Sequence, residues 1–148
     1  MPSVLMNDRG FSLVEVMAAL LLASIIAMTA VLPVKDISAQ MQSEYLLNQL
    51  EQDLHAMQLY AMRAGKEVNF RFYENGKYRA LSEGEVLMER IPRYPLAFRP
   101  LSLNLNELQF NPNGNLRSFG QLRVEAASKN YNLVFQIGRG RFYFLEIE

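Results

Sequence analysis

The sequence predicts an α+β protein in which one long N-terminal helix precedes a C-terminal half rich in β-strands. Residues 16–34 contain no charged side chain, and apolar residues then recur at helical spacings of three and four up to residue 64. From residue 66 onward, apolar and polar residues alternate between turn signals. We expect an antiparallel sheet whose apolar face covers the apolar stripe of the helix.

The composition excludes several classes of protein. The 148 residues suffice for one domain, and 15 Lys and Arg balance 15 Asp and Glu, which disfavours a strongly basic nucleic-acid binder. The absence of Cys excludes disulfides, cysteine nucleophiles and thiolate metal sites. A single His excludes a histidine cluster. We therefore expect no metal, no cofactor and no enzymatic activity.

The uncharged run at residues 16–34 is long enough to cross a membrane. Extended back to Phe11 it has 24 residues, which as a helix span ~36 Å, and a bilayer core is ~30 Å thick. A buried core helix fits poorly because the run is apolar on all sides. A secretory signal also fits poorly, since residues 1–10 carry only Asp8 and Arg9 and are not basic. We expect a retained membrane helix.

Glu15 is the one charge inside this extended run. An acidic side chain in a membrane helix costs ~2.5–3.5 kcal/mol on insertion scales, so it usually has a partner. No basic residue lies between Glu15 and Lys35. Cleavage after Gly10 would give Phe11 a free amine with a reference pKa of ~7.7–8.0. In an assembly, Glu15 of one subunit could pair with that amine on the next.

Residues 9–15 read Arg-Gly-Phe-Ser-Leu-Val-Glu and are followed by the apolar run. This segment resembles the class III (prepilin) signal of type IV pilins and pseudopilins. The resemblance implies that a prepilin peptidase cuts between Gly10 and Phe11, that Phe11 is then N-methylated, and that Glu15 guides assembly. It also implies a leader at 1–10, a long helix at 11–65 and a β-rich head at 66–148. The leader departs from the family in being electrically neutral.

The helix is expected to continue beyond the membrane as an amphipathic stretch that ends at Gly65. Its polar face should carry Gln42, Glu44, Gln49, Glu51, Gln52 and Asp53. The opposite face should form one apolar stripe made of Ile37, Met41, Tyr45, Leu46, Leu50, Leu54, Met57, Ala61 and Ala64. His55 and Glu51 lie one turn apart beside the stripe, and we interpret them as an ordinary surface pair.

The second half shows the alternation and turn residues of a small antiparallel sheet. Asn75-Gly76 marks a tight hairpin turn, and 138–140 marks another. Residues 90–100 contain three prolines and are expected to form a loop or an edge strand. The last strand is apolar on both faces and should be central or covered by the helix. Strands are predicted at 68–72, 78–81, 86–91, 108–110, 122–126, 131–137 and 142–147.

The turn at 111–115 (Asn-Pro-Asn-Gly-Asn) and the ending at 131–143 are similar to those of minor pseudopilins of the GspH type, in particular the ComGD type of Gram-positive competence systems. This resemblance implies a minor subunit of a competence pilus that is needed for DNA uptake. The implied partners are prepilin peptidase, other major and minor pseudopilins, and the membrane. The implied location is the cell membrane for the single-pass prepilin, then the surface pilus.

Two alternatives stay open on the sequence alone. One is a minor pseudopilin of type II secretion or of another type IV pilus, and the other is a single-pass anchored binding module that contacts DNA. Residues 66–148 hold 12 basic and 9 acidic residues, a net charge of +3. Arg90, Arg93 and Arg99 interleave with Tyr94 and Phe98, a pattern that phosphate contact with base stacking would use. We expect DNA contact to be indirect or weak.

Overall fold

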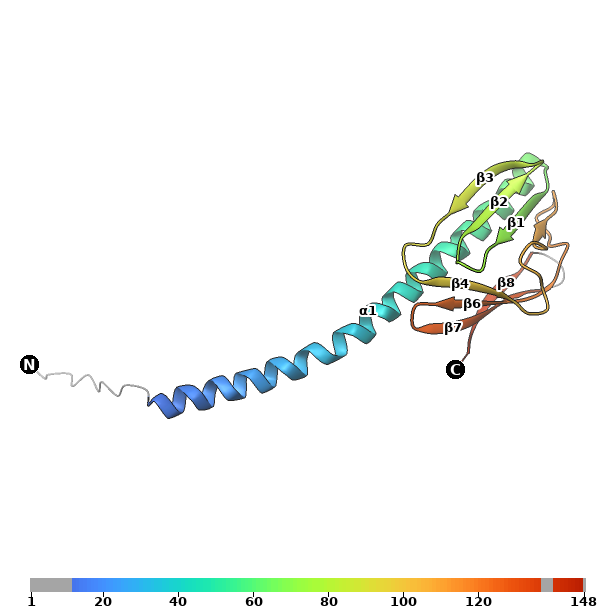
Figure 1. The fold of residues 1–148 in the computed structure, drawn as a ribbon. Coiled ribbons are helices and arrows are strands. Elements are labelled where there is room, and N and C mark those ends of the chain that lie inside the picture. Colours follow the sequence, from blue (N-terminus) through green and yellow to red (C-terminus); the bar gives the residue numbers. More distant parts are fainter. Residues whose placement is uncertain (1–11, 137–139, 148) are drawn as a thin grey trace, which may run out of the picture. The chain divides into compact units, whose positions relative to one another are not determined.

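The computed structural model describes residues 12–136 and 140–147, and it describes side chains over the same residues except 29–36. The predicted leader at 1–10, which ends in Gly10, lies outside the described residues, and so does Phe11. The chain divides into two compact units, Met1–Ile37 and Ser38–Glu148. The second half of the helix therefore belongs to the same unit as the strands. The α+β fold class predicted from the sequence, a long helix followed by antiparallel strands, is confirmed (Figure 1).

Helix α1 covers Leu13–Ala64 and ends where the sequence predicts. The Ser12 carbonyl accepts the first bonds, from the Glu15 and Val16 amides at 3.0 and 3.2 Å. Gly65 follows with a φ of 63°, a left-handed conformation that glycine adopts without a Cβ clash. Within the described part of the chain, no helical stretch meets the length and hydropathy required of a membrane span. The predicted span at 16–34 includes residues 29–34, whose side chains the structure does not describe.

The strands form two antiparallel sheets, where we had predicted one. The first sheet has the order β3-β2-β1-β5 and the second the order β4-β6-β7-β8. Their bounds are β1 Val68–Phe72, β2 Tyr78–Ser82, β3 Glu85–Arg90, β4 Leu96–Pro100, β5 Gln109–Phe110, β6 Gly120–Ala126, β7 Lys129–Phe135 and β8 Phe142–Ile147.

The split into two sheets has a physical cause in the segment between β3 and β4. Pro92 and Pro95 lack the amide hydrogen that a continuing ladder needs, so β4 does not return along β3. It pairs instead with β6, from Leu96 opposite Ala126 to Pro100 opposite Leu122, at the edge of the second sheet. The prediction of a loop or edge strand over 90–100 is thus confirmed for β4.

The predicted turns are present. In the first hairpin the Gly76 amide bonds to the Tyr73 carbonyl at 3.0 Å, and Gly76 has a φ of 81°. In the turn at 111–115 the Asn111 side-chain oxygen accepts bonds from the Asn113 and Asn115 amides, both at 3.0 Å. The predicted turn at 138–140 falls largely outside the described residues.

One continuous apolar core holds the second unit together. It joins α1 to both sheets through Leu50 and Leu54 of the helix, Phe70 of β1 and Leu133 of β7, all of them 0% exposed. The predicted stripe is correct from Leu46 to Ala61 and wrong at its ends. Met41 and Tyr45 are 65% and 49% exposed because each residue turns a helix by about 100°, so Tyr45 lies a quarter-turn or more from Leu46.

Two polar residues occupy the buried face of the helix. Ser43 is 0% exposed, and its hydroxyl donates to the Ala126 carbonyl at 2.8 Å, which ties α1 to β6. Asp53, which we had predicted on the polar face, is 6% exposed. At about 100° per residue it lies about 20° from Leu46 around the helix, next to the range set by Leu46, Leu50 and Leu54, so the helical geometry rather than the residue type decides its position.

Candidate functional site

The sequence places the candidate site at the start of the chain, and Glu15 is the part of it that the structure describes. Glu15 lies in the first turn of α1, where an acidic side chain interacts favourably with the helix dipole. Its side chain is exposed, and no ion pair with it occurs among the described residues. Its predicted partner, the Phe11 amine created by cleavage after Gly10, lies outside that part of the chain.

The helix surface beside Glu15 is hollowed. Ala19 and Ala23 follow Glu15 at intervals of four residues, so the three side chains share one face of α1. Together with Val16 and Leu20 they line a shallow hollow of about 580 Å³. Small side chains let another helix approach closely, so this face can accept a packed neighbour next to the carboxylate. The spacing of the two alanines is visible in the sequence, and the structure adds that they line one hollow with Glu15.

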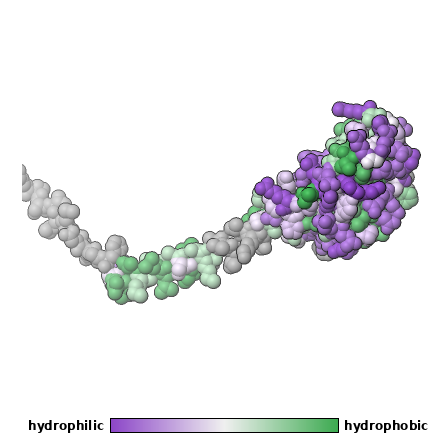
Figure 2. All heavy atoms as spheres, turned by 45° about the horizontal axis from the view of Figure 1, so that its top comes forward, coloured by the Kyte–Doolittle hydropathy of each residue, from purple (hydrophilic) through white to green (hydrophobic). Residues whose placement is uncertain are grey.

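The rest of this helical segment exposes apolar side chains in every direction. Leu13, Leu20, Ile26 and Met28 are 77%, 65%, 68% and 76% exposed, and Figure 2 shows hydrophobic atoms along this stretch. The Ser24 hydroxyl donates to the Leu21 carbonyl at 2.7 Å, which satisfies a polar group inside an apolar segment. A contiguous apolar surface of this extent is unfavourable in water and marks a membrane or protein contact.

The second predicted site, the arginine cluster, has most of its charge engaged in ion pairs. Arg90 donates two hydrogen bonds to Asp53, at 2.9 and 3.1 Å. Arg99 lies 3.2 Å from a Glu74 oxygen and 3.7 Å from a Glu125 oxygen. Arg93 is exposed, and no salt bridge to it occurs among the described residues. These partners compete with any phosphate for Arg90 and Arg99.

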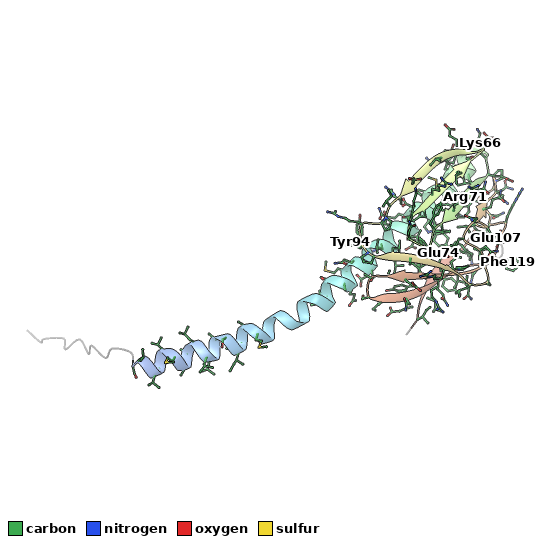
Figure 3. The ribbon with its side chains drawn as sticks, viewed as in Figure 1. Lys66, Arg71, Glu74, Tyr94, Glu107 and Phe119 are labelled. Atoms are coloured by element: carbon green, nitrogen blue, oxygen red, sulfur yellow. The ribbon has the colours of Figure 1, made fainter. Side chains whose placement is uncertain are left out.

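The aromatic residues between these arginines face inward. Phe98 is 0% exposed and packs on Phe72 with a ring separation of 4.8 Å, so it cannot stack on a base in this conformation. Tyr94, which is labelled in Figure 3, is half-buried. Its ring meets the ring of Tyr45 of α1 edge-on, with centroids 6.0 Å apart. The stacking half of the predicted nucleic-acid surface is therefore not assembled, and DNA contact stays a prediction.

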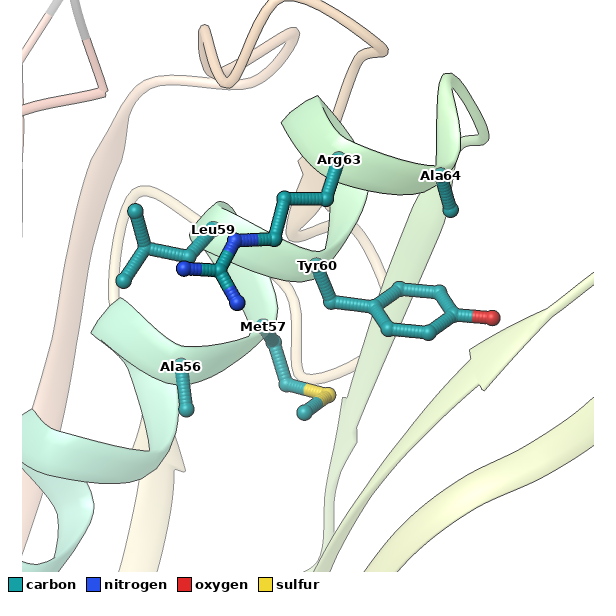
Figure 4. A pocket seen from close by; sticks show the side chains of 6 residues that line it. All are labelled: Ala56, Met57, Leu59, Tyr60, Arg63 and Ala64. Carbon is teal, nitrogen blue, oxygen red and sulfur yellow. The ribbon is translucent and has the colours of Figure 1, made fainter.

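His55 lies near Glu51, as predicted, and it also contacts Phe142, which was not predicted. Its ring lies 4.0 Å from a Glu51 oxygen and 4.6 Å from the Phe142 ring centroid. No group of three or more candidate metal ligands occurs in the described ranges. A hollow of about 520 Å³ lies along α1, and of its lining residues Arg63 alone is charged (Figure 4). These lining residues are Ala56, Met57, Leu59, Tyr60, Arg63 and Ala64.

Sequence reasoning missed a buried polar cluster formed by Asp53, Tyr78 and Arg90. The Tyr78 hydroxyl donates to Asp53 at 2.8 Å, on the oxygen that Arg90 also contacts. Burial, followed by the hydrogen bond to Asp53, raises the pKa of the Tyr78 hydroxyl far above its usual range. The same carboxylate raises the pKa of Arg90. The cluster links α1 to β2 and β3 and has a structural role.

Comparison with known proteins bears on the N-terminal segment. The family model described as the prokaryotic N-terminal methylation motif matches residues 5–31, a stretch that includes Gly10, Phe11 and Glu15. This match supports a type IV pilin-like protein with a prepilin-type signal, which implies processing by prepilin peptidase and assembly with other pilins. No curated protein and no solved structure matches the chain significantly.

Proposed function

We propose that this chain is a minor structural subunit, without enzymatic activity, of a competence type IV pilus required for DNA uptake in transformation. The observation that carries the proposal is the methylation-motif match at residues 5–31, with Gly10, Phe11 and Glu15 in order before an exposed apolar helix. The chain is held in the membrane as a prepilin, cut before Phe11, methylated there, and then moved into the filament through its helix.

Glu15 provides the register of assembly in this proposal. Its carboxylate is exposed beside the hollow formed with Ala19 and Ala23, where a neighbouring helix can lie close to it. The Phe11 amine of the next subunit would carry a positive charge at neutral pH, because its reference pKa is ~7.7–8.0. In an apolar filament core of low dielectric this charge pair favours one axial offset between subunits, since any other offset leaves both charges buried and unpaired.

The competence assignment depends on the similarity of the head to ComGD-type pseudopilins. Two features of the sequence support that similarity. Residues 111–115 form a turn, and the C-terminal segment forms strand β7 followed by β8. The Gln58 side chain of α1 donates to the Gly114 carbonyl at 2.8 Å, so this turn is anchored to the helix. The head then supplies a surface for neighbouring subunits at or near the filament tip.

The decisive experiment has two parts. Mass spectrometry of the mature protein should find an N-methylated Phe11 as the first residue, and an intact Met1 would support an anchored binding module instead. An in-frame deletion should abolish transformation and should be rescued by the wild-type chain but not by an uncleavable Gly10 variant. If the deletion leaves transformation intact and blocks protein secretion, the secretion pseudopilus is the correct assignment.

A further inference from the structure

The last strand of the second sheet has an unprotected edge. β8 pairs with β7 from Phe142 opposite Phe135 to Ile147 opposite Asn130 and is the terminal strand of its sheet. We had predicted a central or helix-covered strand because β8 is apolar on both faces. The structure shows instead that β8 is an edge strand and not a central one. Its inner face meets α1 where Phe142 contacts His55, but its outer face leaves Tyr143 and Leu145 45% and 54% exposed.

The other three sheet edges carry features that discourage pairing with another strand. β3 has a register shift opposite Ala80 and Leu81 of β2 and an exposed charge at Glu85, which has no ion pair among the described residues. β4 ends in Pro100, and β5 is only two residues long. Bulges, charges, proline and shortness are the usual means by which proteins protect sheet edges. β8 has none of these, since its one charge, Glu146, is neutralised by Lys129 at 2.6 Å.

The chemistry of this edge determines what can cover it. A free strand edge exposes a row of alternating backbone hydrogen-bond donors and acceptors. Only another extended backbone can form hydrogen bonds with the whole row. No backbone hydrogen bond joins β8 to a segment other than β7 among the described residues. The occupant is therefore a β-strand with apolar side chains on both faces, which is the character of β8 itself.

Charge favours a second copy of this chain as the source of that strand. In a symmetric pair the same residue of both copies lies in the interface, so like charges at the edge would repel each other. Self-pairing therefore requires an edge without unneutralised charge. The outer-face residues beside the edge are uncharged, namely Asn130, Asn132 and Val134 of β7 and Tyr143, Leu145 and Ile147 of β8. Other charges on that face are Arg123 and Glu125 of β6, two strands from the edge, and Arg141, which precedes β8. A two-fold axis places the two copies of Arg141 at opposite ends of the pair.

We propose that the head self-associates by antiparallel pairing of β8 with β8 of a second copy, about a two-fold axis normal to the sheet. Opposite residues in such a pair share a face, so Tyr143 lies against Leu145 of the second copy and Phe144 against its own counterpart. The pair closes on itself and does not propagate. This inference concerns the head alone and does not depend on the proposed function.

Solution mass and disulfide trapping test this inference on the full-length chain in detergent micelles. The mass of the wild-type protein in the micelle, without the detergent, should be that of a dimer. Leu145→Lys adds a charge to the edge and should give a monomer, and Gln121→Lys adds the same charge to β6 on the same face and should remain dimeric. The chain contains no Cys, so Tyr143→Cys/Leu145→Cys should give an oxidised dimer without background, and Arg123→Cys should not.

Each contrary result overturns the proposal. A monomeric wild type excludes self-pairing, and an edge that is crosslinked in cells only to a different subunit assigns β8 to another partner. A Leu145→Lys variant that stays dimeric shows association through another surface, such as the apolar helix. Near-UV circular dichroism of both Lys variants, compared with the wild type, shows whether the head is folded. N-terminal processing is unchanged in all these variants, so their outcome is separate from that of the proposed function.

Discussion

Arg90 of β3 contacts Asp53 of α1 in a two-pronged ion pair, with nitrogen–oxygen distances of 2.9 and 3.1 Å. Asp53 is almost completely buried, whereas the Arg90 side chain is 45% exposed. The free-energy cost of removing Asp53 therefore differs from the cost of removing Arg90. Tyr78 supplies a third hydrogen bond to the same carboxylate. This cluster ties two strands of the first sheet, β2 and β3, to the helix.

Asp53→Ala should lower the free energy of unfolding by about 2–3 kcal/mol, because it leaves the buried Tyr78 hydroxyl without its acceptor and removes a charged hydrogen-bond partner. Arg90→Ala should cost at least as much, about 3 kcal/mol, because it leaves the buried Asp53 carboxylate without its cationic partner. Glu51→Ala, on the exposed face of the same helix, is the matched control and should change stability by no more than about 0.5 kcal/mol. Urea denaturation followed by circular dichroism measures all three. Equal losses for Asp53→Ala and Glu51→Ala would contradict this assignment.

Tyr78→Phe should make the head less sensitive to alkali. Burial raises the pKa of Tyr78, so above its ordinary value of ~10 the unfolded chain releases the phenolic proton while the folded chain keeps it. The stability that this group contributes is therefore complete below pH ~10 and is lost as the pH rises further. The wild type should lose stability more steeply than the variant between pH ~9 and ~11 in urea titrations. If the stability of the wild type and the variant changed in parallel with pH, Tyr78 would ionise equally easily in the folded and the unfolded chain.

The sequence was a good guide to this fold where side-chain pattern and backbone chemistry agree. The helix end at Gly65 and the turns at Gly76 and 111–115 follow from residues with specific backbone preferences. Asp53 and Ser43 were missed because residue type was given more weight than position. Seen on a helix, Asp53 is three residues after Leu50 and Ser43 is three before Leu46, so both lie on the buried face.

The candidate site residues likewise divide into those that the sequence predicts correctly and those that it does not. Gly10, Phe11 and Glu15 are recognisable because processing reads a linear segment, and residues 5–31 match a family model for that reason. The arginine cluster was inferred from spacing alone, and spacing does not reveal that Glu74, from the β1–β2 turn, lies near Arg99. Likewise, β8 has the composition of a central strand. Its place at an edge depends on long-range pairing that no local pattern encodes.

Gly76→Ala should destabilise the head far more than Gly84→Ala. Both glycines have left-handed backbones, with φ of 81° and 87°, so each substitution carries a backbone cost of about 1–2 kcal/mol. A Cβ at Gly76 would also collide with the Leu96 carbonyl oxygen and lie 2.8 Å from the Leu96 Cβ, whereas nothing lies within 4 Å at Gly84. We expect a loss of about 3 kcal/mol or more for Gly76→Ala. Similar thermal midpoints for both variants would refute the close approach of β4 to this turn.

Glu15→Val should leave the leader cleavable and impair incorporation into filaments. The substitution keeps the helix apolar but removes the carboxylate that would neutralise the neighbouring Phe11 amine. Incorporation, measured by immunoblotting of sheared filaments, should fall about tenfold or more, which corresponds to about 1.4 kcal/mol of lost pairing. Ser24→Ala, which removes a polar group from the same segment without changing charge, is the control. Normal incorporation of Glu15→Val would show that the charge pair does not direct assembly.

Arg93→Ala/Arg99→Ala should leave DNA retention by assembled filaments unchanged. Arg99 is engaged with Glu74 and Glu125, and the Phe98 ring is buried, so the segment does not combine several free cations with an exposed stacking surface. Arg90 is kept in this variant because its removal would disturb Asp53. Each phosphate contact contributes about one unit to the slope of log affinity against log salt concentration, so a direct site would lower the slope by about two units. Arg71→Ala/Arg123→Ala removes the same charge elsewhere on the head, and a slope change specific to Arg93 and Arg99 would establish direct contact.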